Sequence, residues 1–166
     1  MKPITQTILN GDVTNGEETG NCFAACIASI FELPLEEVPN FSWIGRNKHP
    51  DSDSAPVLGS GDWWYYLRDW LAARGLMYFD MAIDGTPPDI LRSLGYHVMT
   101  GKSPRGDWHH SVVGYRGEIV HDPHPDRSGL RSAELFGVFV QKFDGHSVIT
   151  APAHALGVRQ FQEGSR

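Results

Sequence analysis

Two cysteines, Cys22 and Cys26, lie four residues apart in the stretch GNCFAACIAS. The small and apolar residues around them predict a buried helix over residues 21–33, with Asn21 as its N-cap. The unpaired N–H groups at the start of a helix stabilise a thiolate, which is the nucleophilic form of cysteine. Cys22 is therefore a candidate nucleophile, whereas Cys26, one turn further along, suits the role of a small buried hydrophobe.

A histidine and an aspartate in the second half of the chain could activate this cysteine. A catalytic cysteine needs an imidazole to take its proton and a third group to orient that imidazole. If residues 107–123, DWHHSVVGYRGEIVHDP, form a hairpin that turns at the Arg-Gly pair, His110 faces Pro123 and lies diagonal to Asp122, about 5 to 8 Å away. His109 points to the opposite face of the strand, so only one of the two histidines can face the cysteine helix.

These stretches resemble the papain-like cysteine peptidases, and most closely the bacterial peptidases that cleave double-glycine leader peptides, with their small relatives in bacteria and phages. The resemblance is carried by GNCFAACIAS, HSVVGYRGEIVHDP and, more loosely, LPLEEVP, which together cover about a third of the chain. It implies a papain-like fold and a triad in which Cys22 is the nucleophile, His110 the general base and Asp122 the orienting group. His110 is preferred to His109 because it holds the first position of a His-x-Val-Val pattern.

The activity implied by the resemblance is hydrolysis of an amide bond through a thioester acyl-enzyme. The substrate would be a peptide, a protein or a small amide, and the bond a peptide, isopeptide or other amide bond. Transfer of the acyl group to an amine is a variant that the sequence does not separate from hydrolysis. No cofactor is expected, because the thiol, the imidazole and the carboxylate supply the chemistry themselves.

The oxyanion donor is where the chain departs from the family. The family usually has a glutamine a few residues before the cysteine, and this chain has Gly16 at that spacing. Gln6, Asn15 and Asn21 are the alternative side-chain donors, and the backbone N–H of Cys22 is a second donor. Losing one oxyanion donor typically costs about a hundred- to thousandfold in rate. A catalytically weak or inactive binding module for a peptide or partner protein is therefore the second interpretation.

Four further side chains are candidates for substrate contact at the rim of this site: Arg105, His109, His121 and His124. Arg105, in the turn SPRG, would hold a substrate carboxylate. The cluster of histidines and aspartate also offers ligands that suit zinc or a similar ion. Its spacing matches no familiar zinc signature, so no metal is expected, and a His/Asp metal site is the lesser alternative.

The elements that must position these residues follow from periodicity. DWWYYLRDWLAARGL predicts an amphipathic helix that stops at Gly75, and PPDILRSLG predicts a second helix. Alternating β-branched and aromatic residues predict strands at YHVMTG, WHHSVVGY, GEIVHD and FGVFVQKF. Helices first and strands second predict an α+β fold, with an antiparallel sheet packed on the cysteine helix.

A single domain over residues 1–166 is expected from the length of the chain. Residues 41–61 are rich in Ser, Asp, Pro and Gly and predict a long mobile loop, which is either a lid or binding loop or simply a mobile connection. Residues 150–166 predict a weakly anchored tail.

Composition excludes several classes of function. The net charge is −6 and no basic cluster stands out, so a nucleic-acid partner is not expected. No stretch is long and apolar enough for a signal-peptide core or a membrane span, which predicts a cytoplasmic protein without a membrane partner. Two free thiols agree with a reducing compartment.

Overall fold

The structure is a computed structural model that describes residues 1–11, 19–47, 62–82 and 89–142. Its helices and strands follow in this order: α1 (Cys22–Phe31), the 3₁₀ turn η1 (Leu35–Glu37), α2 (Phe41–Asn47), α3 (Asp62–Ala72), β1 (Leu76–Ala82), the 3₁₀ turn η2 (Asp89–Ser93), β2 (Tyr96–Lys102), β3 (His109–Tyr115), β4 (Glu118–His121) and β5 (Ser132–Gln141). The predicted α+β class is confirmed.

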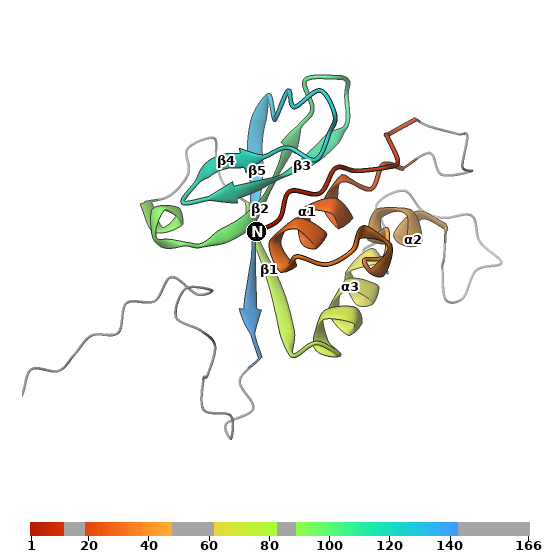
Figure 1. Ribbon diagram of the computed structural model, residues 1–166, viewed down its shortest axis with the longest axis vertical. Helices are drawn as coiled ribbons and strands as arrows, with labels where there is room; N and C mark the ends of the chain where they lie inside the picture. Colours follow the sequence, from red (N-terminus) through yellow and green to blue (C-terminus); the bar gives the residue numbers. More distant parts are fainter. Residues whose placement is uncertain (12–18, 48–61, 83–88, 143–166) are drawn as a thin grey trace, which may run out of the picture.

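The five strands form one antiparallel sheet in the order β1-β5-β2-β3-β4. Helix α1 packs across β2 and β3, and α3 packs against β1. Figure 1 shows all three α-helices on one side of the sheet, while the η2 turn lies on the other. The cysteine helix therefore lies over the strand that carries both candidate histidines.

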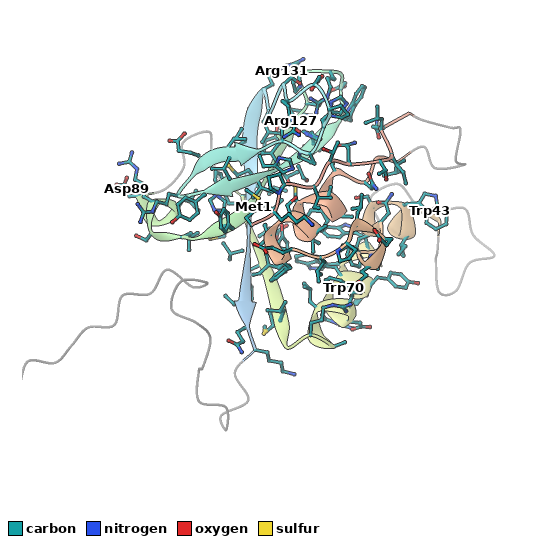
Figure 2. All side chains as sticks on the ribbon, in the orientation of Figure 1. Met1, Trp43, Trp70, Asp89, Arg127 and Arg131 are labelled. Carbon is teal, nitrogen blue, oxygen red and sulfur yellow. The ribbon has the colours of Figure 1, made fainter. Side chains whose placement is uncertain are left out.

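Apolar side chains fill both faces of the sheet. On the α1 side the core joins the buried residues of α1 to Leu67 and Leu71 of α3 and to Val98 and Val113 of the sheet. On the other side a smaller core joins η2 to β2, β3 and β5 through the buried side chains Leu91, Met99, Val112 and Phe136. In Figure 2, Asp89 at the start of η2 lies on one side of the sheet and Trp70 of α3 lies on the other. Each fully buried leucine contributes about 1.5–3 kcal/mol, which anchors the helices to the sheet.

The start of α1 is fixed by aromatic packing. Phe23 lies edge-on against Trp63 of α3, with ring centroids 5.8 Å apart, and edge-on against Tyr78 of β1 at 5.7 Å. Such pairs contribute about 0.5–1.5 kcal/mol beyond the burial of their area. Cys22, the residue before Phe23, is held in place by these contacts.

Two predicted elements differ in the structure, and one strand was missed. Residues 41–61 are not all loop, because Phe41–Asn47 forms α2, whose Phe41 is buried and packs on Trp70 at 5.8 Å. Residues 48–61, and the predicted tail 150–166, lie outside the described residues. The predicted helix at PPDILRSLG is the short 3₁₀ turn η2. Strand β1 was not predicted, because the expected helix was extended as far as Leu76, the first residue of the strand. The strand also has apolar residues on both faces, so no alternation of apolar and polar residues marks it.

The hairpin of β3 and β4 turns at Arg116 and Gly117, as predicted. Both residues have positive φ, 55° and 84°, as a two-residue turn of this hand requires. The predicted register holds for the pairs next to the turn but not beyond them, because a bulge shifts the pairing between Gly114 and Val113. The shift moves the chain that follows β4 by one residue relative to β3.

Among the described residues, none of the helices combines the length and the apolar character needed to cross a bilayer.

Candidate active site

Three elements bring a thiol, an imidazole and a carboxylate together. Cys22 is the first residue of α1, His110 is the second residue of β3, and Asp122 directly follows β4. The Nε2 atom of His110 lies 2.7 Å from Oδ1 of Asp122. The thiol of Cys22 lies close enough to His110 for hydrogen bonding and charge to shift the pKa of both groups. Because Nε2 is occupied by the carboxylate, Nδ1 is the ring nitrogen left for the sulfur. The three groups thus stand in series.

The charges of this series favour a thiolate paired with an imidazolium. Burial alone would raise the pKa of the Cys22 thiol, but the hydrogen bond and charge of His110 outweigh burial and hold that pKa below its ordinary value. Backbone hydrogen bonds from Ser111 and Phe23 lower it further. Burial alone would lower the pKa of His110, but its bonds to Asp122 and Cys22 raise it to about 9.

Cys26 has the opposite environment. It is completely buried within the core of α1, and burial raises the pKa of its thiol well above the ordinary value, with the charges of Cys22 and Asp122 adding to the effect. Cys26 therefore stays a neutral thiol, whereas the half-buried Cys22 reaches the surface.

The carboxylate of Asp122 is held on both oxygens. Its Oδ1 accepts the backbone N–H of His124 at 2.8 Å as well as the bond from His110, and its Oδ2 accepts the N–H of Gly129 at 2.7 Å. Burial alone would raise the pKa of Asp122, but the bond from His110 and these two backbone bonds lower it. The carboxylate therefore stays ionised and keeps the imidazole in one orientation.

The start of α1 lacks the side-chain cap expected from the sequence. Asn21 is the N-cap residue, yet it makes no side-chain hydrogen bond to the first turn in the part of the chain described. Its Oδ1 instead accepts the backbone N–H groups of Thr7 and Ile8, at 3.1 and 3.0 Å, and its Nδ2 donates to Oγ1 of Thr7. The N–H groups of the first turn are thereby left free of a side-chain cap beside the sulfur of Cys22.

The candidate oxyanion donors differ in what they contact. Gln6 is buried, donates from Nε2 to the carbonyl of Ile8 at 2.9 Å, and its Oε1 has no partner among the described residues. Its backbone N–H donates to the carbonyl of Pro123, so Gln6 lies beside the end of β4. The amide of Asn21 is engaged as above, and Asn15 lies outside the described residues.

Two of the rim candidates take part in structural contacts away from the sulfur. His109 is exposed and its Nε2 lies 2.8 Å from Oε2 of Glu134 on β5. His121 is buried rather than on the rim: its Nε2 donates to the carbonyl of Ile4 at 2.8 Å, and its Nδ1 accepts from Arg127 at 2.9 Å. Figure 2 shows Arg127 above β3 and β4. His121 therefore ties the N-terminal segment to β4.

The other two rim candidates lie next to the triad. The ring of His124 stands edge-on to that of His110, with centroids 6.1 Å apart. The guanidinium of Arg105 is turned toward the loop after β4, where it contacts Asp126 and Ser128. Asp126 and Ser128 were not proposed from the sequence, although the turn-forming composition of DPHPDRSG marks this stretch as a tight loop.

A metal site finds no support in the part of the chain described, where no three His, Cys, Asp or Glu side chains are arranged to hold an ion. The ligands of the proposed cluster are instead divided among separate contacts with Cys22, Glu134 and Ile4.

Comparisons of the chain with protein-family models, with curated proteins and with solved structures found no match.

Proposed function

We propose that this protein is a cysteine-dependent hydrolase with a papain-like core, which cleaves a peptide, isopeptide or other amide bond through a thioester. The observation that carries the proposal is that His110 bonds to Cys22 and Asp122 at once, while both carboxylate oxygens of Asp122 are fixed by backbone N–H groups. An imidazole held in this way serves as proton donor and acceptor to one defined sulfur.

The reaction begins with the thiolate of Cys22, which attacks the carbonyl carbon of the amide and moves one electron pair onto the carbonyl oxygen. The backbone N–H groups at the uncapped start of α1 would stabilise that oxyanion. When the C–N bond breaks, His110 gives its proton to the departing amine and the thioester forms. Neutral His110 then takes a proton from water, the hydroxide displaces the sulfur, and a carboxylic acid leaves.

The pH dependence of alkylation tests the thiolate without knowledge of the substrate. Wild-type protein is treated with iodoacetamide across the range from about pH 5 to pH 9, and mass spectrometry of the peptides follows Cys22 and Cys26 separately. We expect Cys22 to react much faster than Cys26 and to keep its rate well below the pH at which an ordinary thiol stops reacting. Equal, slow labelling of both cysteines would contradict the proposal.

A second candidate function is a non-catalytic domain of the same architecture that binds a peptide or a partner protein. The observation in its favour is that the side-chain amides of Gln6 and Asn21 are already bonded to the N-terminal segment. Turnover of a fluorogenic peptide or amide library separates the two, because a hydrolase loses its activity in Cys22→Ala whereas a binding module shows none and retains its ligand in that variant.

A further inference from the structure

We propose that Arg105 is a positioning residue of this site, which fixes the carboxylate of Asp122 against His110 by holding the loop that follows β4. The inference rests on the proposed function and adds to it a residue outside the Cys22, His110 and Asp122 series. Its basis is a set of contacts that join the turn before β3 to residues 122–129.

The guanidinium of Arg105 contacts that loop at three residues. Its Nη1 donates to Oδ1 of Asp126 at 2.9 Å and to Oγ of Ser128, and it lies 3.7 Å from Oδ2 of Asp122. Only 16% of its side chain is exposed. One nitrogen therefore joins two loop residues next to the catalytic carboxylate.

The loop that Arg105 holds is the one that holds Asp122. The two backbone donors to the carboxylate, the N–H groups of His124 and Gly129, lie on either side of Asp126. Asp126 also accepts the N–H of Ser128 at 2.9 Å, which closes the loop on itself. Asp126 and Ser128 lie between the two donors in the chain, so a shift of this loop would disturb the bonds to Asp122.

The other end of the link is equally fixed. Arg105 stands in the turn between β2 and β3, where its backbone N–H donates to Oγ of the fully buried Ser103 at 3.1 Å. The N–H of Ser103 donates to the carbonyl of Trp108, which directly precedes β3. Arg105 thus joins the turn that leads into His110 to the loop that leads out of Asp122.

These contacts favour positioning over substrate binding. The sequence placed Arg105 on the rim, where it would hold a substrate carboxylate. In the structure Nη1 is used by the loop, and Nη2 is buried with no partner among the described residues. Because Nη1 alone makes both loop contacts, the single ammonium of a lysine can replace part of this bridge.

The test compares the alkylation rates of Cys22 in wild type, R105M, R105K, D122N and the double variant R105M/D122N. We expect R105M to react roughly tenfold more slowly than wild type at about pH 6, because a loosened carboxylate weakens the imidazolium that stabilises the thiolate. R105K should recover part of the rate. The double variant should be no slower than D122N, because Arg105 acts through Asp122.

A matched control is R92M, which removes an exposed arginine of η2 whose Nε lies 3.7 Å from Oδ1 of Asp89. It should leave the alkylation profile unchanged. Thermal unfolding of each variant separates a change at the site from general loss of stability, since a merely structural role of Arg105 lowers the midpoint without moving the pH profile.

Two outcomes would overturn the inference alone: a wild-type profile in R105M, or rate losses of R105M and D122N that multiply in the double variant. If wild-type Cys22 is alkylated with the pH profile of an ordinary thiol, and D122N does not change that profile, the proposed function is overturned and this inference with it.

Discussion

His110 interacts with both Asp122 and Cys22, whereas its neighbour His109 pairs with Glu134 at the surface. This difference gives a matched pair of variants. His110→Ala should reduce turnover by about a thousandfold or more, because removing one member of a triad costs nearly as much as removing all of it. His109→Ala should retain most of the activity. Initial rates on the same substrate check both, and the reverse order would show that the wrong histidine was assigned.

The pH profile of turnover follows from the same two groups. Formation of the thioester needs the thiolate of Cys22, whose pKa is lowered, and the proton on His110, whose pKa is raised to about 9. Activity should therefore fall as the pH rises through about 9, and on the acid side only below the ordinary range of a thiol. A profile of kcat/KM against pH measures both limbs. A rate that rises steadily through pH 9 would contradict the assigned ion pair.

At the level of single residues, the sequence indicated Cys22 and His110 through local patterns, namely a helix start and a strand motif. The contacts of Arg105 and the burial of His121 could not be predicted in this way. Arg105 contacts the loop after β4, and His121 contacts Ile4 of the N-terminal segment. Both contacts join residues that are far apart in the sequence. No periodicity records such contacts.

Among the strands, the close approach of β2 and β5 depends on a glycine. A Cβ atom added to Gly101 would lie 1.8 Å from the backbone oxygen of Ser132, at the irregularity in the pairing of these strands. Gly101→Ala should therefore destabilise the protein by about 1–3 kcal/mol. Because Gly101 pairs with His110, the variant should also slow alkylation of Cys22.

Gly95→Ala is the control for this prediction, because no described atom lies within 4 Å of the Cβ it would add. Urea unfolding of the two variants measures the difference in the free energy of unfolding. Equal stability of Gly101→Ala and wild type would show that the strands separate there at little cost.

The prediction of elements succeeded where local chemistry decides the outcome. The Arg116–Gly117 turn and the helix headed by Cys22 are such cases. The bulge between Val113 and Gly114 has no such signature, because an extra residue in β4 is selected by the twist of the completed sheet. Helix α2 was missed for a similar reason, since it is Phe41, buried against Trp70, that holds this short segment helical.

For the whole molecule, the pKa values of two buried histidines are shifted in opposite directions. Burial lowers the pKa of His97, whose Nδ1 donates to the carbonyl of Gly95 at 2.9 Å. His97 binds a proton more readily in the unfolded protein than in the folded one. Its contribution to stability is therefore present above about pH 6.5 and is lost as the pH falls. The raised pKa of His110 gives a contribution that is present below that pH and is lost as the pH rises through about 9.

His97→Asn tests the acid side of this balance, because an asparagine keeps a donor for Gly95 and carries no titrating proton. Its free energy of unfolding should fall less than that of wild type between pH 7 and pH 5, measured by urea unfolding at both values. His109→Asn, at an exposed position, should follow the wild type. Identical losses in wild type and His97→Asn would mean that His97 does not shape the acid limb.

The missing side-chain cap at the start of α1 lowers the stability of the helix and favours the reactivity of Cys22. A side-chain cap is worth about 1 kcal/mol to a helix, and Asn21 gives its oxygen to the N-terminal segment instead. A substitution that restored the cap would strengthen the helix and, by occupying its N–H groups, make the thiol of Cys22 more ordinary. Directed evolution of this chain for thermostability alone should therefore select more stable variants in which the thiol of Cys22 is less reactive.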